Sequence, residues 1–316
     1  MHKININSII LFMLIMLSIT TTSCNSKSKE DKQTDKLTIG VMSSIDYLPI
    51  AVAKERGYFD ENSLDVTIQK FYSANDRDAA LQSGNLDGTI LDYTGGAIQL
   101  AGGIPIKFVS QCDGTFEMIV AQNSNIESVK DLKDKNIAIS RNTVIDYCTS
   151  LALAQAQLSI EDITASEINK IPLRLEMLNN SKIDATMLPD PFATIAKSEG
   201  NKYLISMDDM QVKVTGIAFH QKTIDEKKEA LQKLYKAYNK AVLDLNSEPI
   251  TNFEDVLIKE VGVPANLASS ITLPHFEAAQ PPHEEDLLGV EKWLKEKTLV
   301  PNDFNIAVLV ATGIIE

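Results

Sequence analysis

Polar and aromatic residues follow several short apolar runs of the sequence, and together they could bind a small ligand. Carboxylates accept hydrogen bonds from an amine, hydroxyl and amide groups bind other polar atoms, and tyrosine rings pack against flat or alkyl groups. The candidate ligand-binding residues are Ser43, Ser44, Asp46, Tyr47, Tyr72, Asp92, Tyr93, Thr94, Gln111, Asn142, Thr143 and Asp190.

Acidic side chains outnumber cationic ones among these candidates and their immediate neighbours. Arg141 is the one cation, against Asp46, Asp92 and Asp190. A carboxylate beside an anionic ligand costs free energy unless it is protonated, so the balance favours an amine-bearing ligand. A small oxyanion stays as the alternative, because helix N-termini and hydroxyls supply donors. Each acidic residue could instead cap a helix.

The elements that must position these residues alternate between strand and helix from Leu37 onward. This alternation is typical of a parallel α/β sheet, which binds ligands at the carboxyl ends of its strands. The predicted strands are Leu37–Met42, Leu64–Phe71, Leu86–Leu91, Ile106–Gln111, Glu117–Ala121, Asn136–Ser140, Ile183–Leu188 and Val212–Phe219. The predicted helices are Pro49–Gly57, Asp76–Ser83, Gly95–Ala101, Val144–Gln157, Leu173–Asn180, Phe192–Glu199, Thr223–Asn246, Phe253–Glu260 and Glu284–Glu296.

A short internal repeat indicates two lobes of the same design. Leu81–Leu91 and Leu178–Leu188 both end in an aliphatic residue followed by Asp, a small residue, Thr, an aliphatic residue and Leu. We predict a first lobe of residues 37–113 plus 217–316 and a second lobe of residues 114–216, each a mainly parallel sheet flanked by helices. The C-terminal helices complete the first lobe, and Cys112–Phe116 and Val212–Gly216 form a two-strand hinge.

The N-terminus reads as an export signal. Residues 1–23 contain a short apolar core, too short to span a bilayer, followed by small residues that end at Cys24. This end resembles a bacterial lipobox, although Thr21 stands where an aliphatic residue is usual, and the resemblance implies that Cys24 is lipidated. Residues 24–36 are polar and predict a flexible tether. We expect an exported protein, lipid-anchored to a bacterial membrane and facing the periplasm or the cell surface.

Composition excludes several other classes of function. The 316 residues carry a formal net charge of −13, which disfavours nucleic-acid binding. No cysteine and histidine spacing indicates zinc, and no phosphate-binding glycine loop or nucleophile motif indicates catalysis, so we expect no cofactor and no enzyme. Apart from Cys24, the cysteines are Cys112 and Cys148, which we expect to be buried thiols.

Five segments resemble one family, the periplasmic substrate-binding proteins of bacterial ABC importers, in the group that serves nitrate, sulfonates, taurine and thiamine-precursor pyrimidines. The similarity runs from Leu37 to about Asn246. At the expected ligand-binding helix start, however, Arg141, Asn142 and Thr143 stand where many relatives have Gly-Ser or Ser-Ser. The segments are Tyr47–Phe59 (YLPIAVAKERGYF), Ser83–Gly88, Ile104–Lys107, Ser128–Lys133 and Leu188–Phe192 (LPDPF).

The resemblance implies the two-lobed periplasmic-binding fold, a small organic ligand held between the lobes, and a membrane permease and an ATPase as partners. It also implies a monomer. Among the family's ligands, the acidic candidates favour an aminopyrimidine-like thiamine precursor or another amine-bearing heterocycle, with a sulfonate, taurine or nitrate type of oxyanion as the alternative. An enzyme of thiamine-pyrimidine synthesis and a tethered solute sensor remain alternatives from other classes.

Overall fold

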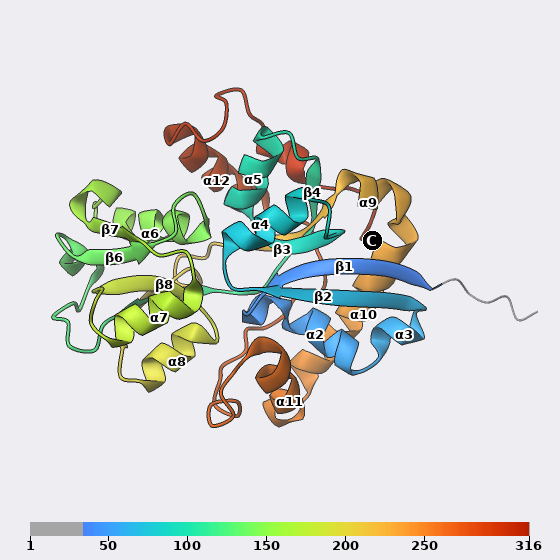
Figure 1. The fold of residues 1–316 in the computed structure, drawn as a ribbon, viewed down its shortest axis with the longest axis horizontal. Coiled ribbons are helices and arrows are strands. Elements are labelled where there is room, and N and C mark those ends of the chain that lie inside the picture. Colours follow the sequence, from blue (N-terminus) through green and yellow to red (C-terminus); the bar gives the residue numbers. More distant parts are fainter. Residues whose placement is uncertain (1–33, 316) are drawn as a thin grey trace, which may run out of the picture. The chain divides into compact units, whose positions relative to one another are not determined.

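Two five-stranded sheets with helices packed against them make up residues 34–315, which the computed structural model describes (Figure 1). The predictions on residues 1–33, namely the signal peptide, Cys24 and most of the tether, lie outside the described residues. The protein is therefore the predicted two-lobed α/β fold. We call the lobe that contains β1 the first lobe and the lobe that contains β6 the second.

The first sheet has the strand order β2-β1-β3-β10-β4. β1 runs parallel to β2 and β3, whereas β10 runs antiparallel to β3 and β4. β1 begins at Asp35 rather than Leu37, because Asp35 and Lys36 already pair with β2. The strands are β1 (Asp35–Met42), β2 (Leu64–Phe71), β3 (Gly88–Asp92), β4 (Ile106–Gln111) and β10 (Thr215–His220).

The second sheet has the order β7-β6-β8-β5-β9. Here β6 runs parallel to β7 and β8, and β5 is antiparallel to β8 and β9. Two of these strands, β7 and β9, are absent from the sequence prediction because both are short and mostly unburied. The strands are β5 (Phe116–Val120), β6 (Asn136–Ile139), β7 (Thr164–Glu167), β8 (Ala185–Pro189) and β9 (Lys202–Ser206).

The predicted helices occur in the predicted order, and α3 is additional. The helix predicted at Thr223–Asn246 is interrupted at Lys227, and the one predicted at Phe253–Glu260 is α-helical only over Glu254–Val256. The C-terminal helices pack on the first lobe, α10 against α2 and α3, and α12 against α5. The first lobe carries α2 (Leu48–Glu55), α3 (Tyr58–Glu61), α4 (Ala74–Gln82), α5 (Tyr93–Ala101), α9 (Gln221–Glu226), α10 (Lys228–Ser247), α11 (Glu254–Val256) and α12 (Glu284–Glu296). The second lobe carries α6 (Val144–Gln155), α7 (Ile171–Asn179) and α8 (Phe192–Ser198).

Among the helices of residues 34–315, none combines the length and apolar composition that a bilayer-spanning segment needs. Cys112 and Cys148 are both free and buried, as predicted. Burial raises the pKa of both thiols, so they behave as small apolar core groups.

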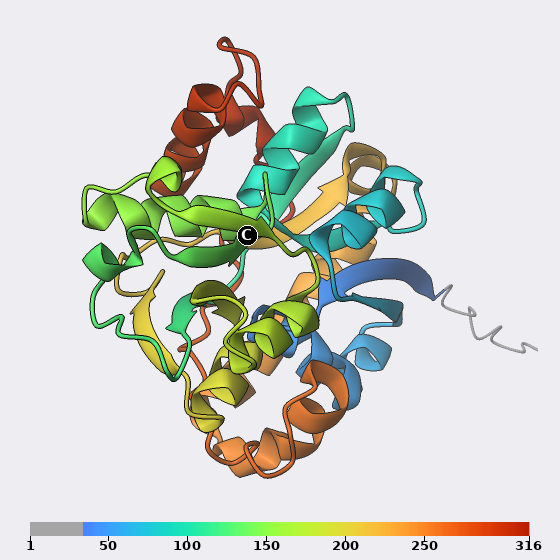
Figure 2. The same ribbon diagram turned by 60° about the vertical axis from the view of Figure 1, so that its left-hand side comes forward.

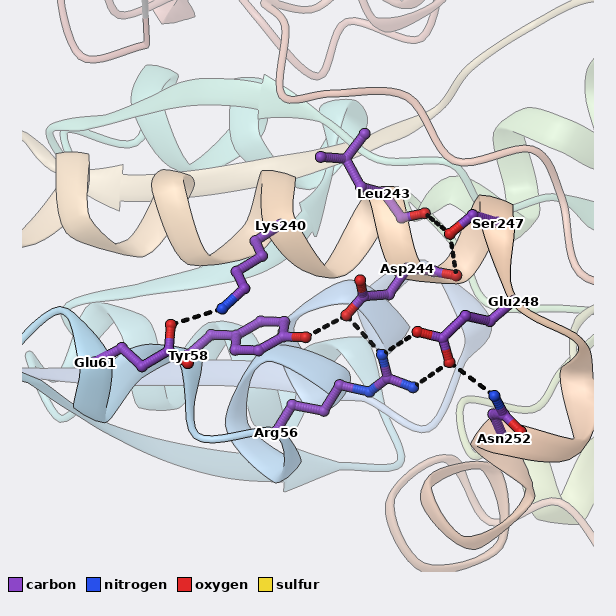
Figure 3. A network of polar contacts seen from close by, with 9 residues as sticks. All are labelled: Arg56, Tyr58, Glu61, Lys240, Leu243, Asp244, Ser247, Glu248 and Asn252. Carbon is purple, nitrogen blue, oxygen red and sulfur yellow. Dashed lines mark hydrogen bonds and ion pairs between the residues drawn. The ribbon is translucent and has the colours of Figure 1, made fainter.

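Polar contacts fasten α2 and α3 to α10 (Figure 3). The Arg56 guanidinium donates to both carboxylate oxygens of Glu248, at 2.6 and 2.7 Å, and to Asp244 at 2.6 Å. The Tyr58 hydroxyl donates to the same Asp244 carboxylate. Gly57 has a φ of 72°, which favours glycine at the turn between the two helices. The Arg-Gly-Tyr segment of the family resemblance therefore attaches α10 to the first lobe.

The internal repeat occupies equivalent positions in the two sheets. Asp87 accepts a hydrogen bond from the Thr38 backbone N–H at 2.8 Å, and Asp184 accepts one from Asn136 at 2.7 Å. The threonines of the two repeat copies act alike, because the Thr89 hydroxyl donates to the Gly40 carbonyl and the Thr186 hydroxyl to the Ala138 carbonyl. Each copy thus joins two parallel strands, β1 with β3 and β6 with β8.

The chain passes between the sheets twice, through residues 112–115 after β4 and residues 207–214 after β9 (Figure 2). The two segments are tied together, because Asp113 forms an ion pair with Lys213 at 3.3 Å and the Cys112 N–H donates to the Thr215 carbonyl at 3.0 Å. The predicted hinge segments, Cys112–Phe116 and Val212–Gly216, overlap these crossings. The lobe boundaries at residues 113 and 217 stay a prediction.

We predict that Thr89→Val and Thr186→Val each lower the free energy of unfolding by about 1–2 kcal/mol. Both threonines are fully buried, and valine keeps the side-chain volume while removing the hydroxyl that joins the parallel strands. Urea unfolding followed by circular dichroism measures the effect. Thr67→Val on the exposed face of β2 is the matched control and should change stability little. If all three variants had the same free energy of unfolding, the proposed role of the two repeat threonines in joining parallel strands would be contradicted.

Candidate functional site

A cavity of about 50 Å³ lies where the two lobes meet. The lobes touch there through their backbones, since the Ile45 N–H donates to the Asp190 carbonyl at 3.0 Å and the Ile171 N–H to the Tyr72 carbonyl at 3.3 Å. Residues that follow the carboxyl ends of β1, β2, β3 and β6 all line the cavity. Open α/β sheets generally bind their ligands at the carboxyl ends of the strands. Its polar lining residues are Ser44, Asp46, Arg77, Asp92, Ser140, Thr143, Asn169, Arg174 and Thr215.

The structure brings four of the predicted residues, Ser44, Asp46, Asp92 and Thr143, to this cavity. A fifth, Asp190, lines a second cavity of about 300 Å³ beside it. The two cavities share Ser44, Asp46, Phe116 and Pro189 on their walls. The carboxylate candidates therefore do converge on one region of the molecule.

The remaining candidates line neither cavity. Ser43, Tyr47, Tyr93, Thr94 and Gln111 are buried in the fold, and Tyr72 and Asn142 are exposed. The Tyr47 hydroxyl donates to the Glu260 carbonyl. The Tyr93 ring packs edge-on against Phe108, with ring centroids 5.0 Å apart. Tyr47 and Tyr93 thus pack within the core, whereas the exposed Tyr72 lines a separate surface pocket.

Asp92 is occupied by contacts within the protein. It caps α5 by accepting from the Gly95 N–H at 2.7 Å, and its other oxygen accepts from Arg77 at 2.9 Å. Arg77 also pairs with Asp78 at 2.7 Å. Burial opposes the charge of Asp92, but Arg77 and the hydrogen bonds hold the pKa of its carboxyl below the ordinary value. Asp92 is therefore ionised and already neutralised.

Arg174 on α7 is the functional candidate that sequence reasoning missed. Its side chain is 1% exposed and lines the cavity, and its Nη1 donates to the Ile168 and Asn169 carbonyls at 3.0 and 3.4 Å. Within residues 34–315, no carboxylate forms an ion pair with it, and its Nε has no hydrogen-bond partner. Burial lowers the pKa of Arg174 to about 10, so the group is still cationic at neutral pH.

The N-terminus of α6 adds further donors at the cavity. Thr143 caps this 12-residue helix by accepting from the Ile145 N–H at 3.2 Å, and Val144 and Ile145 of its first turn line the cavity. A helix N-terminus carries partial positive charge and favours an anion. The departure from the family pattern at Arg141 and Asn142 leaves this end intact, because those two residues are exposed and Thr143 is the cap.

Asp46 is the second carboxylate of the cavity and is 5% exposed. The Ser44 hydroxyl donates to it. Burial raises the pKa of Asp46 despite that hydrogen bond. The hinge lies against it, because a Cβ added to Gly114 would be 2.6 Å from the Asp46 Cβ. Position 114 therefore requires glycine, because any larger side chain would collide with Asp46.

Nothing in residues 34–315 suggests a metal centre, since no group of three or more His, Cys, Asp or Glu side chains is placed to hold an ion. The cavity instead offers buried charges, hydroxyls and a helix N-terminus. These are features of a site that binds a small polar molecule.

The model of the family described as "NMT1/THI5 like" matches residues 44–252. The chain belongs to the NMT1/THI5-like family. Among its relatives is a Bacillus subtilis (strain 168) protein named for the binding of aliphatic sulfonates. It is 24% identical over 244 residues, which are 74% of this chain and 73% of the relative. The resemblance inferred from the sequence is thus confirmed.

Solved structures share the fold of this family member. The alkanesulfonate-binding protein SsuA from Xanthomonas axonopodis pv. citri bound to MOPS has a TM-score of 0.75 at 18% identity, covering 87% of this chain and 98% of that one. The periplasmic nitrate-binding protein NrtA from Synechocystis PCC 6803 has a TM-score of 0.72 at 12% identity, covering 88% and 85%. The chain therefore has the fold of these solved binding proteins.

Helix α12 of the first lobe packs beside α6 of the second lobe (Figure 2). Lys297, just after α12, donates to the buried Asp146 carboxylate at 2.7 Å, and the same oxygen accepts from the Asn142 N–H at 3.0 Å. Tyr147 packs edge-on against Trp293, with ring centroids 5.4 Å apart. Helix α6, whose N-terminus lines the cavity, therefore contacts the first lobe through the side chains of Asp146 and Tyr147.

We predict that Lys297→Met loosens the contact between the lobes and lowers the free energy of unfolding by about 1–3 kcal/mol, because the buried Asp146 loses its cation. Two cysteines would be introduced at exposed positions, one in each lobe, and labelled with fluorophores. Energy transfer between the fluorophores would then measure the interlobe distance. Lys292→Met is the control, since Lys292 is exposed and lies 4.0 Å from Glu296 on its own helix. An unchanged distance distribution and stability in Lys297→Met would contradict the prediction.

Proposed function

We propose that this protein captures a small organic anion of the sulfonate type between its lobes and delivers it to an ABC importer. The observation that carries the proposal is Arg174, a buried guanidinium on the cavity wall without a carboxylate partner in the described residues. A buried charge is costly unless it is paired. An anionic ligand supplies the missing charge, and the Nε side of the guanidinium, which has no hydrogen-bond partner in the described residues, suits an oxyanion.

The surroundings of Arg174 support the same class of ligand. The first turn of α6 lines the cavity with its positive end. The hydroxyls of Ser140 and Thr143 lie on the same wall, where they donate at 2.8 Å to Asn169 Oδ1 and to the Ser140 carbonyl, so the backbone N–H groups of α6 are the donors proposed for a ligand. Backbone N–H groups and hydroxyls are the donors that oxyanions require. The names of the relatives, which refer to sulfonates and nitrate, agree with this chemistry.

The aminopyrimidine interpretation has weaker support. It relies on Asp46, Asp92 and Asp190 as acceptors, yet Asp92 is neutralised by Arg77, and a neutral heterocycle leaves Arg174 without a counter-charge. An amine-bearing ligand stays compatible with Asp46 and Asp190. The oxyanion alternative is therefore the better-supported ligand class for the cavity.

Transport supplies the rest of the proposal. Ligand contacts from both lobes favour the closed arrangement, because a ligand shifts the equilibrium toward the state that it binds more tightly. A permease and an ATPase would then receive the closed protein, which acts as a monomer without catalysis. Lipidation at Cys24 after removal of residues 1–23, and a periplasmic or surface location on the tether, belong to the same proposal.

We predict that Arg174→Gln weakens the binding of butanesulfonate by roughly 30-fold or more, the effect of truncating one partner of a buried charged pair. Arg174→Lys keeps the charge without the planar fork and should bind with intermediate affinity. Isothermal titration calorimetry measures both variants, with thermal unfolding as the check of folding.

Arg141→Gln is the matched control, because Arg141 is exposed and pairs with Glu167 outside the cavity. It should bind butanesulfonate like the unmodified protein. Tight binding of a methylated aminopyrimidine, with no response to any sulfonate, would overturn the proposed ligand class and favour the amine-bearing heterocycle.

A further inference from the structure

Asn169 lies in the loop between β7 and α7 and lines the smaller cavity. On one side of it, the Ile168 N–H donates to the Ile139 carbonyl of β6 at 2.8 Å. On the other side, the Ile171 N–H donates to the Tyr72 carbonyl of the first lobe at 3.3 Å. The loop is therefore held in place on both sides of Asn169, once within its own lobe and once across the lobes.

The backbone of the same loop contacts Arg174. The Arg174 Nη1 donates to the Ile168 carbonyl at 3.0 Å and to the Asn169 carbonyl at 3.4 Å, so the guanidinium folds back over the loop. Both Asn169 and Arg174 line the cavity. The asparagine and the cation proposed to bind the ligand are thus neighbours on one wall.

The side-chain amide of Asn169 has a defined orientation. The Ser140 hydroxyl donates to the Asn169 Oδ1 at 2.8 Å, and Ser140 is itself buried at the carboxyl end of β6. The Asn169 Nδ2 forms no hydrogen bond with any residue from 34 to 315. The acceptor end of the amide is therefore occupied, and the donor end is left for a partner in the cavity.

The charges of the smaller cavity do not by themselves select an anion. Two arginines, Arg77 and Arg174, stand against two carboxylates, Asp46 and Asp92. Because a carboxylate beside an anionic group costs free energy, the ligand needs donors that direct its anionic group toward Arg174. An asparagine amide carries both a donor and an acceptor, so its contribution depends on which end faces the ligand.

We propose that Asn169 binds the anionic group of the ligand through its Nδ2, next to Arg174, and that Ser140 is the positioning residue that keeps this amide in the donating orientation. The inference rests on the proposed function and adds this pair of residues to the site. An oxyanion only accepts hydrogen bonds, so an amide turned the other way would place two acceptors against each other. Ser140 favours the donating orientation because its hydroxyl already uses the amide oxygen.

Two substitutions test the contact between Asn169 and the ligand. Asn169→Leu removes the donor, and we expect butanesulfonate to bind roughly tenfold more weakly or worse, the effect of losing a hydrogen bond to a charged group. Asn169→Asp keeps the oxygen that Ser140 binds but places a negative charge where Nδ2 lies, so it should weaken binding more than leucine does. Calorimetry measures the affinities, with thermal unfolding as the check of folding.

A double-mutant cycle tests the positioning role of Ser140. Ser140→Ala should weaken the binding of butanesulfonate by roughly threefold or more, because the amide is then free to turn. Once residue 169 is leucine, the same substitution should change the affinity little, because no amide is left to orient. A serine that only supports the fold would weaken binding to the same degree in both backgrounds.

Asn136 and Ser166 are the matched control pair. The Ser166 hydroxyl donates to the Asn136 Oδ1 at 2.6 Å, which is the same kind of contact. Asn136 lies at the other end of β6, however, and neither residue lines the cavity. Asn136→Leu and Ser166→Ala should therefore leave the affinity for butanesulfonate unchanged.

Three results would contradict the inference in different ways. Unweakened binding by folded Asn169→Leu and Asn169→Asp variants would overturn it. Equal effects of Ser140→Ala in both backgrounds would overturn the positioning role. In both cases weakened binding by Arg174→Gln would leave the proposed function intact. Failure of the unmodified protein to bind any sulfonate would overturn the proposed function and the inference with it.

Discussion

A cationic guanidinium buried without a counter-charge is the constraint around which the site is organised. Arg174 is almost fully buried, and two backbone carbonyls satisfy part of its guanidinium. Carbonyl dipoles compensate a charge only partly, so the described protein alone leaves this group short of a partner. The other buried arginine, Arg77, has two carboxylates. The two arginines on one cavity wall therefore differ: Arg77 is held in structural ion pairs, whereas Arg174 has no carboxylate partner in the described residues.

Helix α6 links ligand contact to the arrangement of the lobes. Its first turn lines the cavity, and Asp146 and Tyr147 in the same stretch contact the segment around α12. A movement that separates α6 from α12 must break the Lys297–Asp146 ion pair and shift the helix N-terminus that lines the cavity. Under the proposed function, ligand affinity and interlobe contact should therefore change together.

Sequence reasoning reached the fold because strand and helix alternated clearly and one motif recurred. The Asp and Thr of each repeat copy join parallel strands in the same way, so the repeat was a real structural signal. It failed for β7 and β9, whose side chains lack a buried apolar pattern. Arg77 and Arg174 lie within helices rather than directly after a strand, so a search of strand ends alone could not find them.

Asp46 and Asp92 show why residue type and position are insufficient for assigning a site. Both follow a strand of the first sheet, and both are buried on the same cavity wall. Asp92 caps α5 and forms an ion pair with Arg77, whereas Asp46 accepts from the Ser44 hydroxyl and has the hinge glycine against it. The ion pair of Asp92 comes from Arg77 on α4, which no strand-end pattern reveals. The degree to which a buried carboxylate is compensated is therefore a property of the assembled fold.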